Sequence, residues 1–120
     1  MASFSKTILS GSTDGKGIKV AAIETAGTLI HTGSATAATL DEVWLYAVNT
    51  SGSDVKLTIE WGGVAAPDDL IEYTVKAENG LYLIVAGGLI KGNATPLVVR
   101  AFAATANVIV VHGYVNQITA

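Results

Sequence analysis

The sequence predicts an all-β fold, an antiparallel β-sandwich of about seven or eight short strands. Strand-like stretches recur about every 10 to 15 residues between Gly, Asn, Asp and Pro, and no helical period continues over three turns. So many short strands are not stable as one open sheet, and we expect them to stack as two sheets. Immunoglobulin-like and jelly-roll connectivities both fit the strand number. The Cys-Trp-Cys pattern of immunoglobulin domains is missing, because the chain has no Cys.

The N-terminal part is less regular than the rest of the chain. Phe4 to Leu9 is either a strand or an arm, and Gly11 to Gly17 has the composition of a flexible connection. Gly17 to Ile23 and Thr28 to Thr32 then have strand character. We therefore expect residues 1–16 to form an N-terminal arm or an edge strand, and residues 17–120 to form a single β-sandwich domain.

Alternating side chains predict two strands in the middle of the chain. Between Asp54 and Trp61, apolar residues alternate with polar ones, so one face of this strand is buried and the other is wet. Glu42 to Val48 is apolar on both faces, and its aromatic face carries Trp44 and Tyr46. Turn-forming residues from Asn49 to Asp54 separate the two stretches and predict an antiparallel hairpin.

The same reasoning predicts two further hairpins towards the C-terminus. Ile71 to Val75 alternates and is followed, after a turn at Glu78-Asn-Gly80, by a second apolar stretch, Leu81 to Val85. Gly87-Gly88 then interrupts the chain. Leu97 to Ala103 and Val108 to Val115 form the third pair.

The composition favours assembly with other proteins. Half of the residues are apolar and only 14% carry a charge, against about 25% in an average soluble domain. The 17 charged residues would leave large apolar patches on a monomer of this size, so we expect a homo-oligomer, with a trimer favoured. The net charge is −3 and the Lys and Arg residues are scattered, so nucleic acid is not an expected partner.

No membrane or secretion signal is expected either. The longest apolar runs, such as Leu81 to Ala86, are much shorter than the roughly 18 residues that a membrane-spanning helix needs. Met1 to Ser10 lacks the apolar core and cleavage pattern of a signal peptide.

Three groups of residues have side chains of the kinds found in catalytic or ligand sites, and none of them predicts a catalytic, metal or cofactor site. Pro67 to Glu72 brings three carboxylates together, but the two Asp residues are adjacent, so a solvated turn is favoured over a calcium loop. His31 and His112 are the only imidazoles, and neither lies in a nucleophile motif, so we expect structural roles. Gly11 to Gly17 fails the phosphate-loop pattern, because Lys16 is followed by Gly rather than Ser or Thr. We expect a protein without enzymatic activity.

Aromatic and apolar residues are the better candidates for a site. Such side chains supply much contact area at a small entropic cost, and they can fill the core, anchor a protein interface or form a sugar-binding face. Trp61 continues an apolar strand face and is expected in the core. The residues expected at an interface are Phe4, Ile8, Trp44, Tyr46, Tyr82 and Tyr114.

Short motifs along most of the chain carry a resemblance to a protein family. They are Leu9 to Gly15, Ala26 to Thr32, Asp41 to Asn49, Leu57 to Gly63, Pro67 to Glu72, Val98 to Ala103 and Gly113 to Asn116. In these the chain resembles small virion structural proteins of tailed bacteriophages. The resemblance implies a place in the virus particle, with synthesis in the host cytoplasm, and no catalytic residues.

The expected function is therefore that of a capsid decoration or cement protein. Such a protein would bind itself and the major capsid protein, or another virion protein, across the junctions of the shell, where many weak contacts act together. The alternatives are a tail, neck or fibre component of the virion and a carbohydrate-binding module that uses its exposed aromatic residues.

Overall fold

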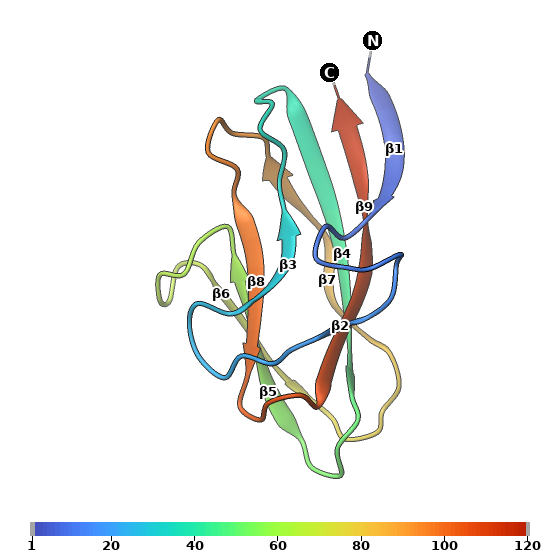
Figure 1. Cartoon of the computed structure of the whole chain (residues 1–120), viewed down its shortest axis with the longest axis vertical. Coiled ribbons are helices and arrows are strands. Elements are labelled where there is room, and N and C mark those ends of the chain that lie inside the picture. Colours follow the sequence, from blue (N-terminus) through green and yellow to red (C-terminus); the bar gives the residue numbers. More distant parts are fainter. Residues whose placement is uncertain (1, 120) are drawn as a thin grey trace.

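The computed structural model describes residues 2–119, and over these residues it contains nine strands in two antiparallel sheets and no helix. Sheet A contains β1 (Ser3–Ile8), β2 (Ile18–Lys19), β4 (Thr39–Asn49), β7 (Tyr82–Lys91) and β9 (Ile109–Thr119). Sheet B contains β3 (Thr28–Thr32), β5 (Val55–Trp61), β6 (Leu70–Val75) and β8 (Val98–Ala103). Figure 1 shows the two layers side by side in a molecule of 48 × 27 × 21 Å. The predicted all-β sandwich is confirmed.

The order of the strands differs from the predicted hairpins. Sheet A runs β1-β9-β4-β7, with β2 beside β9, and sheet B runs β3-β8-β5-β6. The three hairpins expected between β4 and β5, β6 and β7, and β8 and β9 are wrong, because in each case the two strands lie in different sheets. In these three cases, the two consecutive strands lie on opposite sides of the core. Of the described strands, β5 and β6 alone are both consecutive in the chain and paired with each other.

Asn49 explains why the first of these turns crosses between the sheets. Its side chain is fully buried, and its Nδ2 donates hydrogen bonds to the carbonyl oxygens of Ser53, at 2.8 Å, and Val75, at 2.9 Å. Its Oδ1 accepts a hydrogen bond from the backbone N of Ser51. These bonds tie the end of β4 to β6 of the opposite sheet and take the place of the ladder that a hairpin would form.

Strand β7 is longer than predicted, because Gly87 and Gly88 do not interrupt it. Gly87 has a φ of 71° and lies at a bulge between β4 and β7. A Cβ on Gly87 would lie 3.2 Å from the indole of Trp44, and one on Gly88 would lie 2.7 Å from the indole of Trp61. The two glycines therefore leave room for one Trp on each face of the sheet.

The core lies between the inner faces of the two sheets. Every second residue of β4 and β5 is fully buried there, including Val43, Leu45, Leu57 and Ile59. Trp61 is partly buried and packs against this cluster, as its place on an apolar strand face predicted. Burial of each such side chain stabilises the fold by about 1.5–3 kcal/mol.

The N-terminal segment is an edge strand of its own sheet. Residues Ser3 to Ile8 pair with Thr119 to Tyr114 of β9, and every side chain of β1 is exposed. Leu9, which follows, is buried and anchors the strand to the core. Of the segment 1–16 that was expected to be an arm or an edge strand, Met1 lies outside the described residues.

Candidate functional site

The outer face of sheet A is the candidate site. Paired residues of neighbouring strands point to the same side of a sheet, so the register defines which side chains share this face. The outward residues, strand by strand from β1 to β7, are Phe4, Lys6 and Ile8 on β1; Lys19 on β2; Val110, His112, Tyr114, Asn116 and Ile118 on β9; Leu40, Glu42, Trp44, Tyr46 and Val48 on β4; and Leu83, Ala86, Leu89 and Lys91 on β7. Most of these side chains are apolar. Among them, Lys6, Lys19, Glu42 and Lys91 are charged.

Several of these apolar side chains are strongly exposed. Phe4 is 74% exposed, Leu89 56% and Ile8 50%. These three side chains and Leu83 share one face, whereas other exposed apolar side chains, such as Ile23 and Leu81, lie in connecting segments. An apolar patch, which the low charge content led us to expect, thus lies on the outer face of sheet A.

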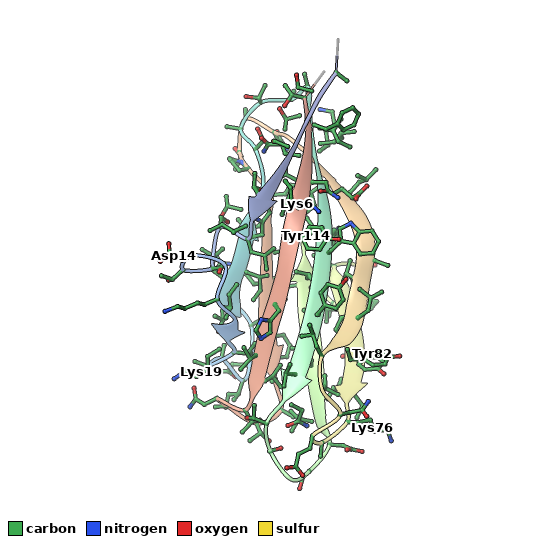
Figure 2. The ribbon with its side chains drawn as sticks, turned by 90° about the vertical axis from the view of Figure 1, so that its right-hand side faces the viewer. Lys6, Asp14, Lys19, Lys76, Tyr82 and Tyr114 are labelled. Carbon is green, nitrogen blue, oxygen red and sulfur yellow. The ribbon has the colours of Figure 1, made fainter. Side chains whose placement is uncertain are left out.

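Stacked rings form the centre of the face. Trp44 and Tyr114 lie opposite each other on β4 and β9, with ring centroids 6.1 Å apart and planes 8° from parallel. The Lys6 ammonium lies 4.9 Å from the centre of the Tyr114 ring, a cation–π contact that Figure 2 shows on the outer surface of the strands. The two rings therefore stack on each other on the outer face and are not part of the core.

Glu42 is held rigidly within this apolar face. Its Oε1 accepts hydrogen bonds from the indole nitrogen of Trp44, at 2.7 Å, and from the Asn116 amide, at 2.9 Å. The hydrogen bond from Trp44 and then that from Asn116 lower the pKa of the Glu42 carboxyl, because both favour the charged form. The site thus carries a fixed negative charge at neutral pH.

A shallow hollow surrounds this charge. It has a volume of about 360 Å³ and is lined by Phe4, Ser5, Lys6, Glu42, Asn116 and Ile118. Two apolar walls therefore flank one cationic and one anionic side chain, a combination that suits a protein surface with both apolar and charged groups.

No protein-family model, curated protein or solved structure matches the chain. Across residues 2–119, the structure has no helix that is long and apolar enough to span a membrane.

The outer face of sheet B is different in character. Lys56 and Glu72 form an exposed ion pair there, with 2.8 Å between Nζ and Oε2. The Glu60 carboxylate also points to this side, but it is fully buried under the segment 25–27, where it accepts hydrogen bonds from the Thr25 hydroxyl and from the backbone N of Gly27. Charged side chains thus lie on the outer face of sheet B beside apolar ones such as Leu29 and Phe102, so this face is more mixed than that of sheet A.

The structure brings five of the six expected interface residues together. Phe4, Ile8, Trp44, Tyr46 and Tyr114 share the outer face of sheet A. Tyr82 lies apart from them at the lower end of β7, where its ring stacks on Tyr73 of β6 with 5.0 Å between centroids. This pair closes the edge between the two sheets, so the position of Tyr82 fits a structural contact.

The sequence reasoning missed Lys6, Glu42, Leu89 and Ile118 as members of the face. Leu89 lay beyond the expected end of β7, and Ile118 lay beyond the expected end of β9. The alternation of the last strand, in which both Val110 and Tyr114 fall opposite the buried residues, was a signal that could have identified an apolar outer face.

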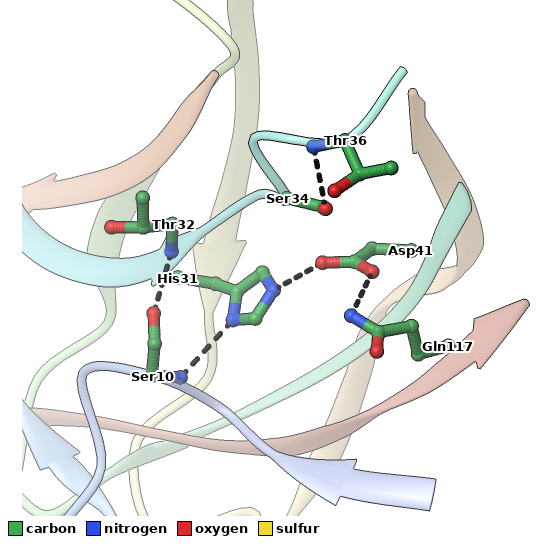
Figure 3. A network of polar contacts seen from close by, with 7 residues as sticks. All are labelled: Ser10, His31, Thr32, Ser34, Thr36, Asp41 and Gln117. Carbon is green, nitrogen blue, oxygen red and sulfur yellow. Dashed lines mark hydrogen bonds and ion pairs between the residues drawn. The ribbon is translucent and has the colours of Figure 1, made fainter. Parts of the chain in front are cut away.

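His31 lies in a buried network of polar contacts beneath β1. Its Nδ1 accepts a hydrogen bond from the backbone N of Ser10 at 3.0 Å, so its Nε2 carries the proton and donates to Asp41 at 2.8 Å. Gln117 donates to the other oxygen of Asp41 at 3.1 Å, and the Ser10 hydroxyl accepts from the backbone N of Thr32 (Figure 3). Both nitrogens of the imidazole and both oxygens of the carboxylate are thus engaged in holding strands together.

The remaining polar candidates also lie in structural contacts. Asp69 accepts a hydrogen bond from the backbone N of Ala65 and so closes its own turn, while Glu72 points to Lys56. Three or more metal-ligating side chains do not gather anywhere in the described part of the chain. His112 lies on the outer face of sheet A opposite Tyr46, close enough to Gly17 that a Cβ there would lie 2.7 Å from its ring.

Proposed function

We propose that the chain is a structural protein without enzymatic activity, which works by burying the outer face of sheet A against other protein. The observation that carries this proposal is the continuous apolar face, with Phe4, Leu89 and Ile8 at least half exposed. Burial of such a face releases about 25 cal/mol for each Å² of apolar surface removed from water. A partner with a matching apolar surface would therefore bind here.

The polar groups of the chain support a structural role. His31, Asp41 and Glu60 are the buried groups with the chemistry that a catalytic site needs, and each already has hydrogen-bond partners within the fold. A general base must keep a lone pair for the proton that it abstracts. The Nδ1 lone pair of His31 is taken by Ser10, and the buried Asp41 and Glu60 carboxylates accept hydrogen bonds that join strands and loops, away from solvent.

The assembly that we propose is the shell of a tailed-bacteriophage particle, with the chain as a decoration or cement protein on the major capsid protein. The support for this finer proposal is the resemblance to small virion structural proteins. A small domain with an exposed apolar face suits this task, because many weak contacts repeated over a lattice add up to a stable shell. A place in the tail, neck or fibre would use the same face.

A second candidate function rests on the stacked aromatic rings. The rings of Trp44 and Tyr114 are nearly parallel and lie on the outer face of sheet A, and a sugar ring could stack against a ring of this kind. A carbohydrate-binding module would bind at least one glycan on an array, and substitution of Trp44 by Ala would abolish that binding. An array without signal would remove this candidate.

Analysis of virus particles tests the proposed function directly. Particles of the bacteriophage that encodes the chain would be purified by density gradient, and their proteins would be quantified by mass spectrometry. We expect the chain in a fixed ratio to the major capsid protein. Its presence in infected cells but not in purified particles would overturn the virion proposal.

A further inference from the structure

One row of side chains across the outer face of sheet A has opposite charges at its two ends. Lys6 on β1 pairs with Asn116 on β9, which pairs with Glu42 on β4. Lys6 and Glu42 therefore stand two strand spacings apart, about 10 Å, with the neutral Asn116 midway between them. A half-turn about an axis along β9 exchanges the two ends of this row.

We infer that the occupant of this face is a second copy of the chain, packed face to face about a two-fold axis that runs along β9. In this arrangement Lys6 of each copy lies against Glu42 of the other, and Asn116 lies against its own counterpart. The inference rests on the proposed function and names the partner of most of the same face. Strand β7, which carries the exposed Leu89, lies outside the three paired strands and is left for the contact with the capsid.

The same rotation also places compatible side chains of the two copies against each other in the neighbouring rows. In the row above, Phe4 meets Leu40 of the second copy and Ile118 meets its own counterpart. In the row below, Ile8 meets Trp44, and Tyr114 meets Tyr114. In these three rows, apolar side chains thus face apolar ones and Lys6 faces Glu42, which is the self-complementarity that a two-fold interface requires.

Other symmetric arrangements fit less well. A two-fold axis across the strands, through the same row, would place Lys6 against Lys6 and Glu42 against Glu42, and like charges in contact cost several kcal/mol. A trimer, which the composition had led us to favour, cannot pack one flat face against itself. The charge pattern therefore favours a pair over a trimer.

The size of the face suits a weak dimer. Strands β4 and β9 have 11 residues each, a length of about 36 Å, whereas β1 has six residues and a length of about 20 Å. With about 4.8 Å for the width of each strand, each copy offers roughly 450 Å² and the pair would bury roughly 900 Å². This area lies below the roughly 1,200 Å² of most stable interfaces, so we expect a weak association.

Two charge reversals test the arrangement. Light scattering over a concentration series up to about 1 mM, well above the dissociation constant of a weak dimer, should give a mass that rises towards 24.6 kDa for the natural chain, twice the 12.3 kDa of one copy. Lys6→Glu places two acidic side chains opposite each other, and Glu42→Lys does the same with two basic ones. Each variant alone should weaken the dimer by about 100-fold or more.

A mixture of the two variants provides the decisive result. When Lys6→Glu and Glu42→Lys are combined in equal amounts, each charge again meets its opposite, so the dimer mass should return although neither variant dimerises alone. Lys56→Glu is the matched control, because it makes the same charge change on the outer face of sheet B, and it should leave the dimer unchanged. Circular dichroism of each variant shows whether the fold is retained.

The outcomes separate this inference from the proposed function. A natural chain that stays at 12.3 kDa, or a mixture that stays monomeric, would overturn the face-to-face pair. If such a chain is nevertheless found in purified particles, the virion proposal stands without the pair. If the chain forms the dimer as described but is absent from purified particles, the face-to-face pair stands and the virion proposal is removed.

Discussion

Replacement of Asn49 by Ala should destabilise the sandwich more than any surface change of the same size. The Asn49 side chain is fully buried and donates to the Ser53 and Val75 carbonyl oxygens, the latter in the buried interior. Loss of one partner of a buried hydrogen bond costs about 1–3 kcal/mol, so the loss of both bonds together should lower the free energy of unfolding by about 2–4 kcal/mol. For a domain of this length, that corresponds to a fall in Tm of roughly 10–15 °C.

Two further variants make this prediction specific. Asn49→Asp keeps the size of the side chain but places an acceptor opposite two carbonyl oxygens, so it should be at least as destabilising as Asn49→Ala at neutral pH. Asn93 is exposed and bonds to Ser34 through its backbone N, so Asn93→Ala is the matched control. Urea unfolding followed by circular dichroism would measure all three. An Asn49→Ala variant within 0.5 kcal/mol of the natural chain, about the scatter of surface changes, would refute the role given to this side chain.

Three other perturbations follow from the structure. The hydrogen bonds from Trp44 and Asn116 lower the pKa of Glu42 in the folded chain, so the charged carboxylate stabilises the fold above its ordinary pKa of 4.5. This stabilisation is lost as the pH falls through the lower pKa of the folded chain. Glu42→Gln should therefore reduce the dependence of Tm on pH below 4.5, and an unchanged dependence would contradict the assignment. Gly92→Ala should lower Tm strongly or prevent folding, because the added Cβ would overlap the Thr36 carbonyl oxygen. Gly52→Ala is the control, because its Cβ would meet nothing within 4 Å and should be tolerated. Equal Tm values for the two variants would count against this packing. Asp41→Ala should lower the free energy of unfolding by about 2–4 kcal/mol, because it leaves the buried N–H of His31 and the amide of Gln117 without their acceptor. Urea unfolding would measure this loss, and a value below about 1 kcal/mol would show that water replaces the carboxylate easily.

The sequence was a good guide to strands and faces. Alternation along β4 correctly separated Val43 and Leu45, which are buried, from Trp44 and Tyr46, which point outward. This works because successive side chains of a strand point to opposite faces, whatever the strand pairs with. It is also why five of the six residues expected at an interface fall on one face of sheet A, although they were chosen without knowledge of the topology.

Strand pairing could not be predicted in the same way. Turn-forming residues from Asn49 to Asp54 suit a hairpin as well as a crossing between sheets, and the choice depends on the buried contact of Asn49 with Val75, which is distant in sequence. The row of Lys6, Asn116 and Glu42 likewise combines three strands whose neighbours are not consecutive. Its charge pattern exists only once β1 and β4 are known to flank β9.

The central claim, that the outer face of sheet A is the surface of assembly, is tested most directly by hydroxyl-radical footprinting of the natural chain at low and high protein concentration. Phe4, Trp44 and Tyr114 report on this face, and Phe102, which is paired with Thr58 and points outward from sheet B, serves as the internal reference. We predict that oxidation of the first three falls at high concentration while that of Phe102 stays constant. Equal oxidation of all four at both concentrations, or protection of Phe102 alone, would contradict the account.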